Sequence, residues 1–136
     1  MQVKIKAKTY GPLRVNVGAD NSIWCESEAG NRVRLGPVPA ADALSPSDLI
    51  LASLANCIAI SVRMAAGQMA LELGTLDLSA IAIKATDLPN RFGRFEVGIK
   101  TGAAISADKA DELLSRTKEI CTISNTLGAE IALQLN

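Results

Sequence analysis

Apolar and polar positions alternate through the first quarter of the chain. A period of two is typical of half-buried strands. Four such runs follow one another, and turn sequences rich in glycine, proline or asparagine separate them. The runs cover residues 3–9, 13–17, 22–27 and 32–35. Residues 1–36 are therefore predicted to form a meander of short antiparallel strands.

A long apolar helix is predicted over residues 45–69. Ser45 and Pro46 suit the N-cap and the first helical position. Residues 49–62 carry no charge, and apolar side chains fall on every face of the helix. A membrane span needs about 20 apolar residues, and Arg63 comes too early for that. The pattern therefore predicts a core helix that is buried on all sides.

Such a helix favours a dimer. A chain of 136 residues has only a few short strands with which to cover it. A small domain also buries a smaller share of its surface than a large one. The simpler solution is to pack two copies of the helix against each other, so a homodimer is expected.

The second half of the chain adds strands around one more helix. Two alternating runs, separated by a loop at Pro89, predict a hairpin over residues 76–101. Apolar positions at helical spacing predict an amphipathic helix over 106–121, and a last strand follows at 130–135. This order is typical of an α+β fold. The length fits one domain, residues 1–136.

Charge and composition exclude several classes of function. The 14 Lys and Arg residues balance the 14 Asp and Glu residues, so no basic surface is expected for nucleic acid or for a membrane. Histidine is absent, which excludes a Ser-His-Asp triad and a Cys-His pair. Three scattered cysteines without a CxxC motif predict no zinc site. The N-terminus has no signal-peptide core, so a cytoplasmic location is expected.

The cysteines are the remaining candidates for chemistry. Cys57 lies within the apolar helix, with Ser53 and Ser61 one turn to either side. Cys121 lies at the end of the amphipathic helix, where the negative end of the helix dipole suits a resolving cysteine better than an attacking one. The alternative interpretation is that both are small core residues. Cys25 is interpreted as structural.

Three segments carry a resemblance to a known family. They share a proline and an acid at a helix start ahead of a cysteine, a long hairpin strand, and a second cysteine followed by Ser124. The segments are 45–57, 90–97 and 121–127. Together they resemble the OsmC/Ohr family of osmotically inducible and organic hydroperoxide resistance proteins, over nearly the whole chain. The sequence departs from the best-known peroxidases of that family at Ser47, where they have glutamate, and at Thr122, where they have proline.

The resemblance implies an intertwined homodimer that reduces organic hydroperoxides. Cys57 would be the peroxidatic cysteine and Cys121 the resolving one, and the two would form a disulfide. An arginine from the N-terminal strands would stabilise the thiolate. Arg14 is the best match by position, with Arg32 and Arg34 as rivals.

Asp48 is a further candidate site residue by resemblance, although its place one residue after the family's glutamate also suits a simple first-turn cap. No resident cofactor is expected. A small or protein-bound dithiol, for example a lipoyl group, would reduce the disulfide. The apolar helix favours a bulky organic peroxide over hydrogen peroxide.

Two other functions fit the same sequence. A non-catalytic dimer would bind an apolar ligand, such as a fatty or aromatic acid, in an interface pocket, with the sulfur atoms too far apart to join. A redox-switched interaction protein would form the disulfide but turn over slowly, and oxidation would change its dimer or its partner binding.

Overall fold

The computed structural model describes residues 5–136. It divides into two compact units, Met1–Asp48 and Leu49–Asn136. The strand predicted over residues 3–9 begins outside the described residues, and no strand forms over 5–9. Ile5 in this stretch is 90% exposed. Alternation alone does not make a strand, because a strand also needs a neighbour to accept its hydrogen bonds.

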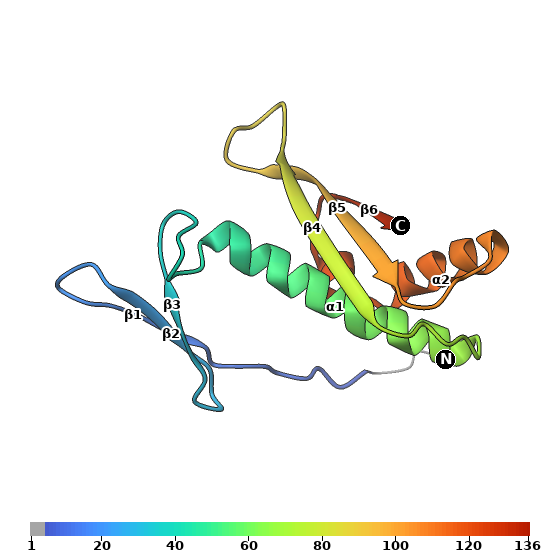
Figure 1. Ribbon diagram of the computed structural model, residues 1–136. Coiled ribbons are helices and arrows are strands. Elements are labelled where there is room, and N and C mark those ends of the chain that lie inside the picture. The colour runs from blue at the N-terminus through green and yellow to red at the C-terminus, as the bar shows by residue number, and fades with distance from the viewer. Residues whose placement is uncertain (1–4) are drawn as a thin grey trace. The chain divides into compact units, whose positions relative to one another are not determined.

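The first unit holds a three-stranded antiparallel sheet, drawn in blue to cyan in Figure 1. Its strands are β1 (Arg14–Val17), β2 (Ile23–Glu26) and β3 (Arg32–Leu35). Val15 pairs with Cys25, and Cys25 pairs with Val33. Side chains alternate between the faces of a sheet, so these three share one face. This sheet corresponds to the meander predicted for residues 13–35.

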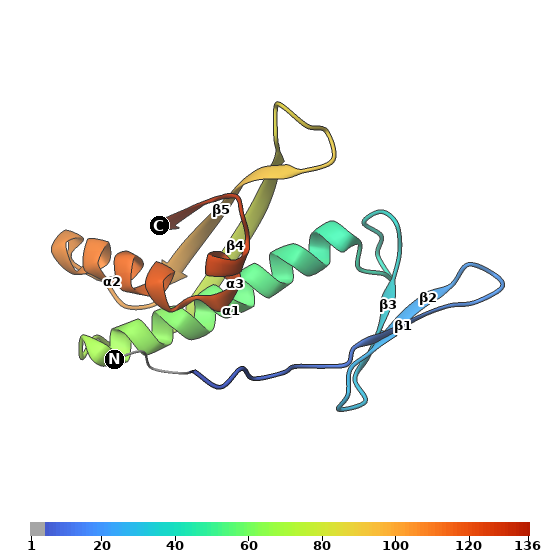
Figure 2. The same cartoon turned by 180° about the vertical axis from the view of Figure 1, so that it is seen from behind.

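The second unit is a sheet covered on one face by helices. The sheet contains β4 (Leu76–Lys84), β5 (Phe92–Thr101) and β6 (Glu130–Leu135). β4 pairs with β5 in antiparallel fashion, whereas β6 runs parallel to β5. The helices are α1 (Pro46–Gln68), α2 (Ala107–Ile120) and α3 (Thr122–Thr126). Figures 1 and 2 show the helices together on one side of this sheet.

The core lies between α1 and the sheet. Phe95, Val97 and Ile99 alternate along β5 and are at most 2% exposed. They form one cluster with Leu54 and Ile58 of α1. The alternating apolar residues of β5 and the apolar residues at helical spacing on α1 therefore pack together in the same apolar layer.

α1 is not buried on all sides, and that prediction is wrong for the single chain. Leu54, Ile58 and Val62 are fully buried, but Ile60 is 57% and Met64 53% exposed. The sheet and the other helices reach only one face of α1, because each can cover only the side that it packs against. α1 is long and apolar enough to cross a membrane by length and composition, a test that core helices of soluble proteins also pass.

The C-terminal end of α1 closes with a Schellman motif. Leu71 N–H donates to the carbonyl of Ala66, and Ala70 N–H donates to that of Gly67. Ala70 has a φ of 52°, the left-handed conformation that usually selects glycine at this position. The turn therefore holds one residue in a conformation that its side chain disfavours.

Candidate redox site

Cys57 and Cys121 meet in the second unit. Cys57 is half-buried on α1 and packs against the apolar cluster. Cys121 is fully buried in that cluster. It ends α2 and caps the start of α3, where its Sγ accepts a hydrogen bond from Ser124 N–H at 3.3 Å. Both cysteines belong to the same apolar cluster, and each shifts the pKa of the other, so the fold brings together the residues that the sequence singled out.

The pKa of Cys57 is lowered. Burial by itself raises the pKa of this thiol, but four hydrogen bonds outweigh burial. The donors are the N–H groups of Ile123 and Thr122, the Cys121 thiol and the Ser61 hydroxyl. Each of them favours the thiolate over the neutral thiol. Cys57 is therefore the sulfur of the pair that carries the negative charge more readily.

The pKa of Cys121 is raised. Burial is the largest cause, and a negative charge on neighbouring Cys57 adds to it. Hydrogen bonds from Ser124 N–H and Ser61 act in the opposite direction without cancelling the rise. The environment thus shifts the pKa values of the two thiols in opposite directions.

The sequence interpretation required a cation beside Cys57 and missed the backbone donors. α3 begins at Thr122, directly after Cys121, and its first N–H groups are free of intrahelical partners. The backbone of Thr122 and Ile123 lowers the pKa of Cys57. Proline has no N–H, so Thr122 supplies a donor that proline at this position would lack. The replacement of proline by Thr122 was visible in the sequence, but the direction of its N–H group was not.

Asp48 lies in the cap of α1. Its Oδ2 accepts hydrogen bonds from the N–H of Ser45 at 2.9 Å and from the Ser45 hydroxyl at 3.0 Å. Asp48 N–H donates to the Ser45 hydroxyl in return, at 3.2 Å. This is a reciprocal capping box, with aspartate in the place of the usual glutamate. The carboxylate that the resemblance made a site candidate is thus engaged in holding the helix start.

The candidate arginines lie in the first unit. Arg32 stacks over the Trp24 ring at 4.7 Å from its centroid. Arg34 lies 3.7 Å from Asp42. Arg14 is exposed on β1, and no ion pair holds it within residues 5–136. Among the three arginines, Arg14 has the fewest contacts with charged or aromatic groups within residues 5–136.

Cys25 lies on β2 and is 8% exposed. All three cysteines are free thiols. Within residues 5–136, no group of three or more His, Cys, Asp or Glu side chains is placed to hold a metal ion. The chemistry of the described residues therefore rests on thiols.

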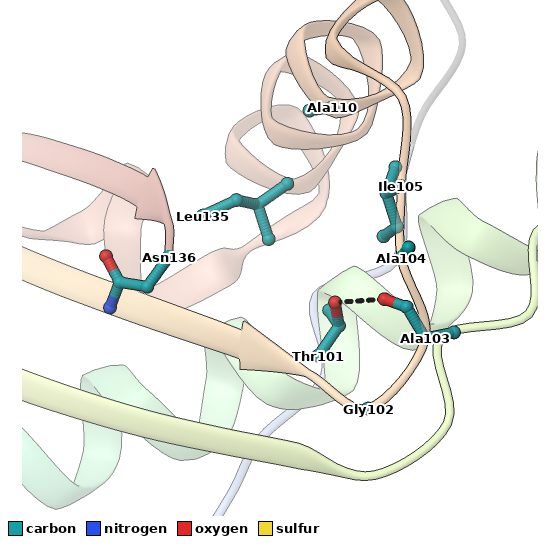
Figure 3. A pocket seen from close by; sticks show the side chains of 8 residues that line it. All are labelled: Thr101, Gly102, Ala103, Ala104, Ile105, Ala110, Leu135 and Asn136. Carbon is teal, nitrogen blue, oxygen red and sulfur yellow. Dashed lines mark hydrogen bonds between the residues drawn. The ribbon is translucent and has the colours of Figure 1, made fainter.

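A separate hollow lies where β5 leads into α2. It has a volume of about 550 Å³ and is lined by Thr101–Ile105, Ala110, Leu135 and Asn136. Figure 3 shows Leu135 and Ile105 on opposite sides of it. The lining includes no thiol and no charged side chain, so this hollow offers no redox chemistry.

Comparison with known proteins identifies the family of the chain. The model of the OsmC-like protein family matches residues 39–136. No curated protein matches the chain by sequence. Among solved structures, an OsmC-like protein from Mycoplasma pneumoniae aligns with a TM-score of 0.84 at 18% identity, over 96% of this chain and 98% of that one.

Two structures of organic hydroperoxide resistance proteins align as well. One is the organic hydroperoxide resistance protein OsmC from Legionella pneumophila, with a TM-score of 0.77 and 18% identity, over 96% of this chain and 99% of that one. The other is the organic hydroperoxide resistance protein OhrB of Bacillus subtilis, with a TM-score of 0.69 and 17% identity, over 94% of this chain and 98% of that one. At these identities the likeness shows the fold, and the family model covers most of the sequence. The chain therefore belongs to the family of OsmC-like proteins.

Proposed function

We propose that this protein is a thiol-dependent peroxidase that reduces organic hydroperoxides to alcohols. The observation that carries the proposal is the packing of Cys57 against the cluster that contains Cys121, where the pKa of Cys57 is lowered and that of Cys121 is raised. Organic hydroperoxide resistance proteins from Legionella pneumophila and Bacillus subtilis share the fold. Both facts favour an attacking Cys57 and a resolving Cys121.

In the first step the Cys57 thiolate attacks the distal oxygen of the peroxide. A sulfur–oxygen bond forms, the oxygen–oxygen bond breaks, and its electron pair leaves on the alkoxide, which takes a proton to become the alcohol. Cys57 is oxidised to a sulfenic acid. The lowered pKa serves this step because the thiolate is the nucleophile.

In the second step Cys121 attacks the Cys57 sulfur. The sulfur–sulfur bond forms as water leaves, and the product is a Cys57–Cys121 disulfide. An external dithiol, for example a lipoyl group, then reduces the disulfide by two thiol–disulfide exchanges. No resident cofactor takes part.

The surroundings of Cys57 favour a bulky apolar peroxide. Cys57 packs against the cluster that contains Leu54, Ile58 and Phe95. An alkyl or aryl group loses less on leaving water for such a surface than hydrogen peroxide does.

The proposal includes a cytoplasmic homodimer. The exposed apolar residues Ile60 and Met64 on α1 support a second copy as the cover of that face. The free thiols are consistent with a reducing compartment. Arg14 would approach the thiolate from either subunit, and Asp48 would act by fixing the start of α1.

Turnover measurements test the proposal. Peroxide consumption is followed with a dithiol donor, comparing cumene hydroperoxide with hydrogen peroxide. Wild-type protein is expected to consume the organic peroxide faster. Cys57→Ser is expected to abolish consumption, Cys121→Ser to stop it after the first oxidation, and Cys25→Ser to leave it unchanged. Wild-type consumption no faster than that of Cys57→Ser would refute the proposal.

A further inference from the structure

The two cysteines of the candidate pair differ in how easily a molecule from solution can reach them. Cys57 is half-buried on α1, whereas Cys121 is fully buried, with 0% of its surface exposed. Cys121 belongs to the buried core cluster with Phe95 and Ile131, and Cys57 packs against that cluster as a partly buried residue. A thiol from solution therefore reaches Cys57 without movement of the core, but it reaches Cys121 only if the core opens.

Hydrogen bonds also hold Cys121 in its buried position. Its N–H donates to the Thr117 carbonyl at 3.0 Å, and its carbonyl accepts a hydrogen bond from Asn125 N–H at 3.0 Å. Its Sγ accepts a hydrogen bond from Ser124 N–H at 3.3 Å. These contacts tie Cys121 to α2 on one side and to α3 on the other. Bringing its sulfur to solvent would break them together with the packing of the core.

Nucleophilic displacement at sulfur has a fixed geometry. The attacking atom, the sulfur and the leaving atom lie nearly in line, because the attacking electron pair enters the antibonding orbital of the bond that breaks. In the proposed peroxidase reaction, Cys121 therefore approaches the Cys57 sulfur from the side opposite to the oxygen of the sulfenic acid. A thiol that later displaces Cys121 must approach Cys57 from the side opposite to Cys121, which is the side that the oxygen has left.

We propose that the external dithiol attacks the Cys57 sulfur of the disulfide, along the path by which the peroxide entered, and that Cys121 is the leaving thiolate. This inference rests on the proposed peroxidase function. A sulfur–sulfur bond forms between the dithiol and Cys57, and the Cys57–Cys121 bond breaks with its electron pair on the Cys121 sulfur. Ser124 N–H donates to that sulfur, and such a hydrogen bond is stronger when the acceptor is charged. It stabilises the Cys121 thiolate until a proton from water neutralises it.

The second thiol of the dithiol completes the reduction. As a thiolate it attacks the dithiol's own sulfur in the mixed disulfide, and the bond to Cys57 breaks with its electron pair on the Cys57 sulfur. The dithiol leaves as a cyclic disulfide that has given up two electrons. The lowered pKa of Cys57 favours this step, because a thiol of lower pKa leaves faster. The raised pKa of Cys121 slows its departure in the first step, but the alternative attack requires access to a sulfur that the core covers.

Brief exchange with a monothiol identifies the sulfur that is attacked. The Cys57–Cys121 disulfide is formed in the full chain with diamide, so that the test does not depend on peroxide turnover, and one equivalent of 2-mercaptoethanol is then added. The reaction is quenched in acid, the protein is unfolded, and free thiols are alkylated with N-ethylmaleimide. Digestion without reductant and mass spectrometry locate the adducts. The control is the same oxidised protein unfolded in urea before the thiol is added, because both sulfurs are then open.

The folded protein is expected to carry 2-mercaptoethanol on Cys57 and N-ethylmaleimide on Cys121, in at least about a tenfold excess over the reverse pattern, because attack on Cys121 needs an opening of the core. The unfolded control should show the thiol on both cysteines. In the folded protein, an adduct mainly on Cys121 or equally on both would overturn the proposal, as would the absence of a disulfide after diamide. If the adduct lies on Cys57 but cumene hydroperoxide oxidises neither cysteine, the proposed peroxidase function fails and the direction of exchange stands.

Discussion

Asp48→Ala separates a structural role of this carboxylate from a chemical one. Asp48 Oδ2 accepts two hydrogen bonds from Ser45, at 2.9 Å from the N–H and 3.0 Å from the hydroxyl. Ser45 is 1% exposed, so water cannot easily replace the lost acceptor. The substitution therefore leaves a buried N–H and a buried hydroxyl without their acceptor at the start of α1.

The magnitude follows from these contacts. Loss of a helix cap costs about 1 kcal/mol, and an acid in the first turn contributes about 0.5 kcal/mol through the helix dipole. An unpaired buried group adds about 1 kcal/mol. Asp48→Ala is therefore expected to lower the free energy of unfolding by about 2.5 kcal/mol, or the melting temperature by about 10 °C for a domain of this size.

Thermal unfolding followed by far-ultraviolet circular dichroism provides the assay. Asp42→Ala is the control, because it removes an acid whose ion pair with Arg34 is exposed and 3.7 Å long; it should change stability by less than about 0.5 kcal/mol. Ser45→Ala combined with Asp48→Ala should cost less than the sum of the two single changes. Equal stability of Asp48→Ala and Asp42→Ala would refute the capping argument. The rate at which iodoacetamide alkylates Cys57 can also be measured across pH. If the pH midpoint of that rate changed in folded Asp48→Ala, the carboxylate would instead belong to the thiol site.

Three further predictions concern other parts of the chain. Ala70→Gly removes the side chain from a left-handed residue with φ of 52° and should stabilise the protein by about 1 kcal/mol in thermal unfolding; a lower melting temperature would contradict this. The rate of Cys57 oxidation should rise with pH and level off below the usual thiol pKa, because the reactive thiolate forms at lower pH when the pKa is lowered; stopped-flow measurement showing a midpoint above the usual value would contradict this. Ile60→Glu places a charge on the exposed apolar face of α1 and should shift the dimer to monomer in sedimentation, whereas Lys109→Glu should not; a dimer retained in Ile60→Glu would count against that interface.

The sequence predicted the elements that local patterns specify. Ser45 and Pro46 mark the start of α1 by residue type alone, and the period of two marks β4 and β5. The parallel pairing of β6 with β5 could not be predicted, because alternation of side chains is the same in either direction. Residues 5–9 alternate without forming a strand, since pairing depends on a neighbour rather than on pattern.

The two cysteines of the candidate site could be predicted from the sequence, but the groups that surround them could not. Cys57 and Cys121 stood out as thiols at the centre of one helix and the end of another. α3 has five residues, too few for a helical period to be recognised, so the donors at Thr122 and Ile123 were missed. Ser61 was noted as a neighbour of Cys57, but in an apolar helix serine is also a common small core residue. Its effect on the pKa of Cys121 depends on tertiary packing.

The central claim is that Cys57 and Cys121 form a reversible redox pair. The most direct test is mass spectrometry of the protein after one equivalent of cumene hydroperoxide, followed by digestion without reductant. The account predicts a protein lighter by two hydrogens, a peptide pair joined through Cys57 and Cys121, and recovery of the original mass after addition of a dithiol. Oxidation confined to Cys25, or a stable Cys57 sulfenic acid beside an unmodified Cys121, would contradict it.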